Sequence, residues 1–169
     1  SEMCIRDRAC TALKLIPDPL KSHPVFLCID DTMVSKFGKK FENVSKLFDH
    51  AAHNGSNYLN GHCFVSIMLC VPVLDHDKIS YLSVPLGYRM WQKKESKLEL
   101  AATMIRKVMP EFQSREHVII LCDSWYTKQN LVCIVNEYPN LDLIGNARID
   151  SVMYDLCLLY TSPSPRDVE

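Results

Sequence analysis

Two short stretches decide the fold that this sequence predicts, VFLCIDDT at residues 25–32 and VIILCDSW at residues 118–125. Each is a run of apolar residues, typical of a strand buried in a sheet, and each leads into acidic residues. The first run delivers Asp30 and Asp31, and the second delivers Asp123. A carboxylate beside a buried strand is costly unless it is paired or bound to a metal. If the two strands are neighbours, these acids meet at one edge of the sheet.

The segment between the two runs predicts a hairpin. Residues 62–73 and 79–91 are two long apolar stretches typical of strands, and the polar turn Asp75–Lys78 joins them. Residues 32–61 are polar and show little periodicity, which predicts a functional loop or an irregular hairpin.

Two helices and a last strand complete the predicted order. Apolar residues at helical spacing predict a helix over residues 96–109, with Ser96 as its N-cap and Pro110 at its end. Residues 127–138 predict a short helix, and residues 141–148 predict the last strand. The resulting order of three strands, helix, strand, helix and strand indicates an α/β fold. It is that of a ribonuclease-H-like mixed β-sheet flanked by helices, in which the first three strands are antiparallel and the later ones parallel.

The composition limits the classes of protein that fit. With 169 residues, 47% hydrophobic and 23% charged, the chain is too apolar for a disordered segment and long enough for one core. No apolar run reaches the roughly 18 residues of a membrane span. The net charge of -1 gives no whole-chain attraction to nucleic acid, so DNA contacts must come from local patches. The eight cysteines form no CxxC pair, which favours reduced thiols over disulfides or structural zinc.

The acids at the strand ends predict a metal site. Two or three converging carboxylates, with no lysine expected beside them, are hard oxygen ligands that suit Mg²⁺ or Mn²⁺. Two such ions can activate a water or a 3′-hydroxyl and stabilise the leaving oxygen of a phosphodiester. The alternative is that Asp30, Asp31 and Asp123 only cap strands or turns.

Taken together and in this order, the motifs of residues 24–156 resemble the catalytic domain of bacterial insertion-sequence transposases of the Asp-Asp-Glu (DDE) type. The motifs that carry the resemblance are FLCIDDT (26–32), GKK (38–40), FDH (48–50), GH (61–62), PLGYRMW (85–91), KLELAATMI (97–105), VIILCDSWYTK (118–128) and LIGNARID (143–150).

The resemblance implies roles for the acids. Asp30 is the expected first catalytic residue and Asp123 the second, and both are expected metal ligands. Asp31 is the alternative to Asp30, because adjacent side chains on a strand point to opposite faces. The third catalytic residue, a Glu on a later helix, is expected beyond residue 156, since Glu137 precedes the last strand and lies on the wrong element.

The resemblance also implies a reaction and partners. The complete enzyme is expected to use two Mg²⁺ or Mn²⁺ ions to hydrolyse phosphodiesters at the ends of the element and to join them to target DNA. Double-stranded DNA is the expected partner, bound by a homodimer in the bacterial cytoplasm at the nucleoid. Without the third acid, this fragment is expected to be inactive.

The two ends of the chain resemble translated adapter sequence from transposon-based sequencing libraries, read in opposite orientations. We therefore expect residues 1–8 and 157–169 to be adapter-derived. Residues 9–24, which contain three prolines, are expected to be a linker or the end of a missing N-terminal domain. Residues 25–156 are then the truncated ribonuclease-H-like transposase catalytic domain.

Basic residues near the predicted site are candidates for contacts with DNA phosphates. The candidates that we assign to DNA binding are Lys36, Lys39, Lys40, Arg89, Lys128 and Arg148, and Lys93, Lys94 and Lys97 form a further basic group. The alternative for the basic groups is a solvated turn or hairpin end.

Aromatic residues and histidines near the acids allow two interpretations. Trp125 and Tyr126 could stack on a distorted base or pack in the core. His62 could orient a carboxylate or the DNA backbone, whereas its spacing from His50 and His53 fits no zinc site.

Two other classes of protein fit the same pattern. A phosphatase or phosphotransferase with a strand-end Asp nucleophile prefers Asp-x-Asp, whereas Asp30 and Asp31 are adjacent. A non-catalytic nucleic-acid-binding module on the same fold differs from an enzyme only in whether the acids hold metal.

Overall fold

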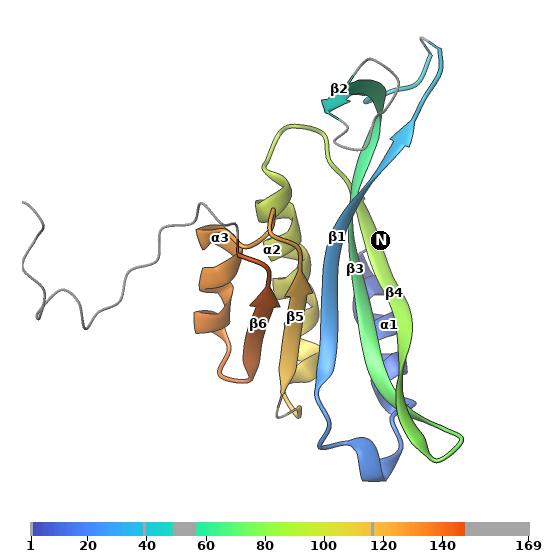
Figure 1. Cartoon of the computed structure of the whole chain (residues 1–169), viewed down its shortest axis with the longest axis vertical. Helices are drawn as coiled ribbons and strands as arrows, with labels where there is room; N and C mark the ends of the chain where they lie inside the picture. Colours follow the sequence, from blue (N-terminus) through green and yellow to red (C-terminus); the bar gives the residue numbers. More distant parts are fainter. Residues whose placement is uncertain (1, 39, 49–56, 116, 148–169) are drawn as a thin grey trace, which may run out of the picture.

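The computed structural model describes residues 2–38, 40–48, 57–115 and 117–147 (Figure 1). Several predictions fall outside these ranges. They are the DNA-binding candidates Lys39 and Arg148, the histidines His50 and His53, and the end 157–169.

A single mixed sheet organises the described chain. Its strand order is β2–β3–β1–β5–β6, and β4 also pairs with β3, on residues beyond those that pair with β2. β1 and β3 are antiparallel, as are β3 and β4, while β5 is parallel to both β1 and β6. The strands are β1 (Val25–Ser35), β2 (Ser45–Phe48), β3 (Tyr58–Asp75), β4 (Lys78–Met90), β5 (Val118–Cys122) and β6 (Leu141–Gly145). The described chain is therefore a mixed α/β fold built on one mixed sheet.

Strands, rather than a loop, form both ends of the polar connection over residues 32–61. β1 continues through Ser35, and the short β2 pairs with the start of β3. Gly61 pairs with Ser35 on one side and with Ser45 on the other. A Cβ on Gly61 would lie 2.3 Å from the Val34 carbonyl oxygen, so only glycine permits this close approach of strands. The irregular hairpin, rather than the loop, is the better description of these ends.

The helices lie on one face of the sheet, where α1 contacts both β4 and α2. α2 begins as predicted, at a capping box in which Ser96 and Glu99 exchange hydrogen bonds. None of the described helices is long and apolar enough to span a membrane. The helical elements are α1 (Glu2–Lys14), η1 (Asp18–Leu20), α2 (Lys97–Val108), η2 (Met109–Phe112), α3 (Gln129–Val132) and η3 (Cys133–Glu137).

Of the two expectations for residues 9–24, a linker or the end of a missing N-terminal domain, the linker does not fit the structure. Ala9, Ala12, Ile16 and Leu20 are all buried in the core, and α1 also contains residues 2–8. The physical reason is a helical spacing of apolar residues along one face, which the nearby prolines obscured. This segment therefore packs as part of the core.

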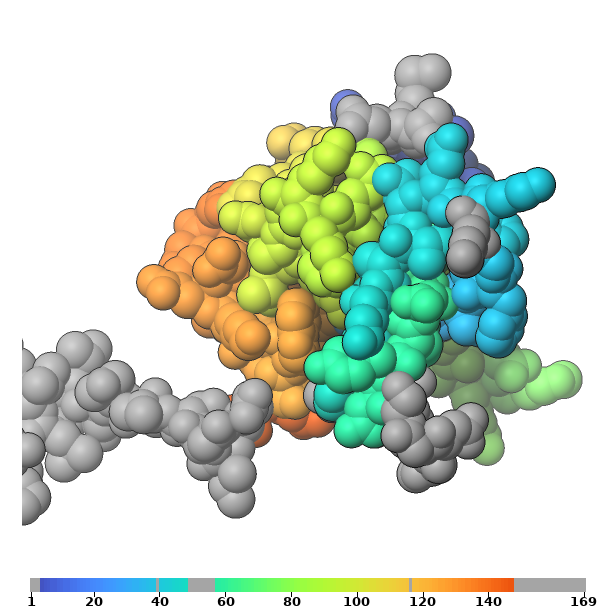
Figure 2. Space-filling view, turned by 90° about the horizontal axis from the view of Figure 1, so that it is seen from above, coloured from blue at the N-terminus to red at the C-terminus, as the bar shows by residue number. Residues whose placement is uncertain are grey.

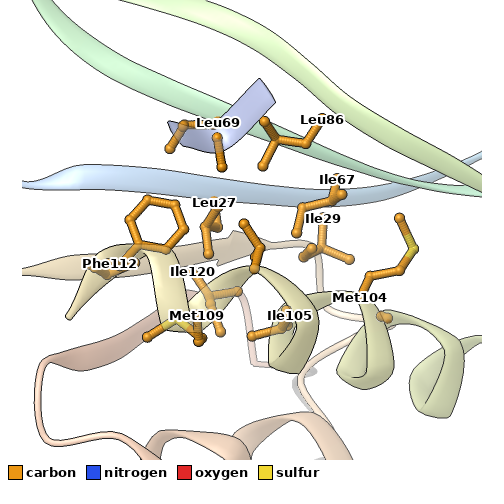
Figure 3. Close-up of a cluster of buried hydrophobic side chains, with 14 of the residues drawn as sticks. Leu27, Ile29, Ile67, Leu69, Leu86, Met104, Ile105, Met109, Phe112 and Ile120 are labelled. Carbon is orange, nitrogen blue, oxygen red and sulfur yellow. The ribbon is translucent and has the colours of Figure 1, made fainter. Parts of the chain in front are cut away.

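The core fills the space between the sheet and α2 (Figure 3). Alternate residues of β1 and β3 point into it, among them Leu27, Ile29, Ile67 and Leu69, and all four are buried. Their neighbours along each strand are partly exposed on the opposite face. This alternation also decides which face each residue at the end of β1 reaches.

Candidate active site

A pocket of about 340 Å³ lies beside the second half of β1, just beyond the carboxyl end of β5. The predicted adjacency of these two strands is confirmed, since they are parallel neighbours with Ile29 opposite Cys122. Figure 2 looks onto this end, where the cyan segment around β2 lies beside the yellow-green segment that leads into α2. The residues that line the pocket are Asp31, Met33, Lys46, Leu47, Phe48, Trp91, Lys93, Lys97, Asp123 and Trp125.

Asp31 is the acid from β1 that lines this pocket together with Asp123. It follows Leu27 and Ile29 on the core-facing side of the strand, and its side chain is 16% exposed. Asp30 is exposed, is not among the lining residues, and its Oδ1 accepts a hydrogen bond from the backbone N–H of Asp31 at 2.8 Å. The geometry therefore favours Asp31, the alternative first acid, over Asp30 as the partner of Asp123.

Three side chains hydrogen-bond to the Asp31 carboxylate. Lys97 Nζ donates to Oδ2 at 2.6 Å, the Tyr126 hydroxyl donates to Oδ1 at 3.1 Å, and the Cys63 thiol donates to Oδ2 at 3.3 Å. Burial, followed by the hydrogen bond to Asp31, raises the pKa of Cys63 to about 11. Burial and the negative charge of Asp31 also raise the pKa of Tyr126. Both groups therefore stay protonated and serve as donors at neutral pH.

Lys97 is the lysine that the sequence analysis did not place beside the acids. It begins α2, and its side chain is 17% exposed where it meets Asp31. Burial lowers the pKa of Lys97, but the hydrogen bond and charge of Asp31 outweigh this and raise the pKa overall. The expectation of carboxylates without a neighbouring lysine is thus wrong, because helix packing brings together residues 66 positions apart.

The two tryptophans of the chain flank the same ammonium. Lys97 Nζ lies 5.4 Å from the ring centroid of Trp91 and 5.1 Å from that of Trp125. These distances are within the range of cation–π attraction. Lys97 is therefore held by one carboxylate and two indole rings.

Asp123 lies in the turn that follows β5. Its Oδ1 accepts hydrogen bonds from the backbone N–H groups of Trp125 at 3.0 Å and Tyr126 at 3.3 Å. This is the bonding of a turn-capping aspartate, so the capping role considered from the sequence is present here. Asp123 is nevertheless exposed and lines the pocket, which leaves carboxylate oxygen accessible to a ligand.

The pocket offers part of a metal site. Two carboxylates from adjacent strands are the hard donors that Mg²⁺ and Mn²⁺ prefer, and they fit such an ion. Within the described ranges, no group of three or more His, Cys, Asp or Glu residues is placed to hold a metal. Glu137 is ion-paired with Arg106 at 2.6 Å and does not line the pocket. The fit therefore involves two ligands, one of which is paired with Lys97.

The predicted DNA-binding residues are not all brought together. Lys93 and Lys97 line the pocket, and Lys128 lies over the Trp125 ring at 4.8 Å. Lys36 lies over the Phe41 ring at 5.5 Å, in the connection from β1 to β2. Lys40 is exposed in that connection, whereas Arg89 lines a separate pocket against α1.

The structure distinguishes between the roles considered for the aromatic residues and for His62. Tyr126 is fully buried, so of the two aromatic residues only Trp125 faces the pocket. The ring of His62 pairs with the Glu42 carbonyl at 2.8 Å rather than with an acid. Sequence reasoning missed Lys46 and Phe48, which β2 brings to the pocket and which alternate with Leu47. SKLF reads polar, polar, apolar, apolar, so it carries no alternating pattern that could mark β2 in the sequence.

Comparison with known proteins identifies a family. A family model described as DDE superfamily endonuclease matches residues 7–166. No curated protein matches the chain significantly. Among solved structures, a chain of the piggyBac transposase synaptic complex with hairpin DNA is 15% identical with a TM-score of 0.44, and the match covers 82% of this chain and 26% of that one. A chain of the Mos1 strand transfer complex is 13% identical with a TM-score of 0.36, covering 88% of this chain and 43% of that one. This chain thus spans about a quarter of the first and less than half of the second.

Proposed function

Because this chain belongs to the DDE superfamily endonucleases, we propose that its pocket is the catalytic site of a transposase that cuts and joins DNA. The observation that carries the proposal is the meeting of Asp31 and Asp123 in one pocket, beside the second half of β1 and just beyond the carboxyl end of its parallel neighbour β5. Lysine and tryptophan side chains around these acids supply positive charge and stacking surfaces. This combination suits a phosphodiester substrate.

In this proposal Asp31 and Asp123 hold the divalent cations, Mg²⁺ or Mn²⁺. Bound cations of this kind supply activation of the attacking oxygen and neutralise charge on the scissile phosphate. Asp30 remains the family-based alternative for the first ligand. Tyr126 and Cys63 orient the Asp31 carboxylate by donating to it, so that its position is preset by the fold.

The basic side chains at this end of the molecule bind the DNA backbone in the proposal. Lys46 and Lys93 lie at the pocket, Lys128 lies beside Trp125, and Lys36 and Lys40 lie on the connection from β1 to β2. Phosphate contacts of this kind position the duplex without reading its sequence. The resemblance to bacterial insertion-sequence transposases further supports double-stranded DNA as substrate, homodimers on the DNA, and a bacterial, nucleoid-associated location.

Metal binding tests the proposed site. Free Mn²⁺ is measured by electron paramagnetic resonance during titration of the 169-residue chain. Asp31→Asn and Asp123→Asn are each expected to weaken Mn²⁺ binding by roughly tenfold or more, since losing even a supporting partner of a metal ligand has effects of this size. Asp142→Asn on β6 is the matched control and should bind as the wild type does, because Asp142 is exposed away from the pocket.

An Asp30→Asn variant shows which of the two adjacent aspartates binds the metal ion. If Asp30→Asn loses Mn²⁺ and Asp31→Asn does not, Asp30 is the ligand and our assignment of Asp31 is wrong. If all four variants bind Mn²⁺ like the wild type, the pocket is not a metal site.

A non-catalytic nucleic-acid-binding module is the second candidate function. The observation that favours it is the Lys97–Asp31 ion pair, which already neutralises one acid. A DNA-binding experiment separates the two functions, because such a module binds duplex DNA without needing Asp31, Asp123 or a metal ion. Fluorescence anisotropy of a labelled duplex measures this binding with and without MgCl₂.

A further inference from the structure

We propose that Lys97 is an internal counter-ion that occupies Asp31 in the metal-free protein and must release it before a divalent cation can bind. This inference rests on the proposed function, since it takes Asp31 as a metal ligand. The inference assigns to Lys97, which is not one of the expected acidic residues, control over the access of a divalent cation to Asp31. Lys97 thereby becomes a positioning residue, because it acts through Asp31.

The competition follows from the hydrogen bonding of one carboxylate. Lys97 Nζ lies 2.6 Å from Oδ2 of Asp31, which also accepts from Cys63, while Oδ1 accepts from Tyr126. Both Asp31 oxygens are therefore engaged. Of the three donors, only Lys97 carries a positive charge, so only Lys97 repels an incoming cation as well as occupying the oxygen.

Burial makes this repulsion strong. The two side chains are 17% and 16% exposed, so water screens their charges poorly. An ammonium and a divalent cation on one carboxylate at such a site repel each other, and one of them must leave. The four-carbon stem of lysine is flexible, which allows Lys97 to withdraw its charge without movement of α2.

The indole rings provide a direct signal of this exchange. Trp91 and Trp125 are the only tryptophans in the chain, and the Lys97 ammonium lies within 5.4 Å of both ring centroids. When Lys97 leaves Asp31, the charge beside both rings changes. Intrinsic tryptophan fluorescence therefore reports the position of Lys97 independently of any DNA cleavage.

The experiment is a titration with MgCl₂ alone, followed by calorimetry and by tryptophan fluorescence. Lys97→Met keeps an unbranched apolar side chain, removes the charge, and is expected to bind Mg²⁺ about tenfold more tightly, the equivalent of one charge-assisted hydrogen bond. Lys97→Arg keeps the charge and should bind as weakly as the wild type. In the wild type, Mg²⁺ is expected to change the fluorescence, and in Lys97→Met this change should largely disappear.

Lys93→Met is the matched control, because Lys93 lines the same pocket and lies over Trp91 at 5.8 Å but has no bond to Asp31. It should tighten Mg²⁺ binding by less than about threefold, as expected for an exposed charge. The inference is overturned if Lys97→Met binds no more tightly than the wild type or than Lys93→Met. If Lys97→Met does not fold, a wild-type chain that binds Mg²⁺ without any fluorescence change overturns it equally.

The failure of this inference and that of the proposed function are distinguishable. If Asp31→Asn abolishes Mg²⁺ binding but Lys97→Met leaves the affinity unchanged, the metal site stands and the counter-ion role is wrong. If Asp31→Asn binds Mg²⁺ like the wild type, the assignment of Asp31 as a metal ligand is wrong, and the counter-ion role falls with it.

Discussion

Tyr126 has the largest fully buried side chain among the described residues, and its hydroxyl faces a carboxylate. A buried phenol needs a hydrogen-bond partner, and here that partner is Asp31. The contact therefore links the core of the protein to the pocket, since the Tyr126 ring packs inside while its oxygen fixes the acid.

Tyr126→Phe is expected to lower the free energy of unfolding by about 1.5–3 kcal/mol, because it removes a hydrogen bond to a charged acceptor. Urea unfolding at pH 7 measures this loss. An unchanged free energy of unfolding would show that the hydroxyl does not restrain Asp31.

The same variant has a predicted pH dependence. The pKa of Tyr126 is raised above its ordinary value of 10.0, so the folded chain keeps a proton that the unfolded chain releases above about pH 10. The wild-type stability therefore falls as the pH rises above about 10. The stability of the Tyr126→Phe variant should fall less steeply over that pH range. A parallel decline in the stability of both proteins would contradict the prediction.

The start of α2 connects local sequence to the site. The Ser96 hydroxyl accepts from the backbone N–H of Glu99 at 3.1 Å, and the backbone N–H of Ser96 donates to Oε2 of Glu99 at 2.9 Å. This capping box places the first residue of the helix, Lys97, where its side chain reaches Asp31. The helix cap thus positions the Lys97 ammonium group as well as stabilising α2.

Ser96→Ala is expected to cost about 1 kcal/mol of stability, because the first turn of α2 loses its side-chain acceptor. Ser96→Asp is the control, since an aspartate at this position accepts the same hydrogen bond. Thermal or urea unfolding compares the three proteins. Equal losses in both variants would mean that the cap contributes nothing specific.

The whole molecule has a nearly balanced charge, with lysines at both ends of its long strands. Lys46 and Lys93 lie at the pocket, near the end where Figure 1 shows β2, while Lys21 and Lys78 lie at the other end of the long strands. A duplex bound at the pocket end would contact only the first pair. In the proposed function, DNA affinity therefore comes from the lysines at the pocket end rather than from the net charge of the molecule.

Replacing both Lys46 and Lys93 by Ala is expected to weaken duplex binding and to make its salt dependence shallower. If each lysine contacts one phosphate, the slope of log affinity against log salt changes by about 0.9 per lysine. Fluorescence anisotropy at several KCl concentrations measures the slope. The control pair Lys21→Ala and Lys78→Ala should leave it unchanged, and an equal effect from both pairs would rule out a localised DNA site.

Much of the fold was predictable because its elements carry strong local signals. The apolar run VFLCI marks β1, the run VIILC marks β5, and the spacing of apolar residues marks α2. Segments with mixed signals were not. Pro17 follows α1 and Pro19 lies within η1, and these prolines suggest a linker, although Ile5, Ala9 and Ala12 are spaced for one face of α1.

That acids follow two buried strands can be read from the amino-acid order, since a run of apolar residues identifies such a strand wherever it lies in the fold. That Asp31 faces the pocket with Asp123 depends on the packing of the folded chain, because the two faces of a strand differ only once helices cover one of them. The same packing also pairs Lys97 with Asp31. That contact joins residues far apart along the chain, and it forms only when α2 packs against the sheet.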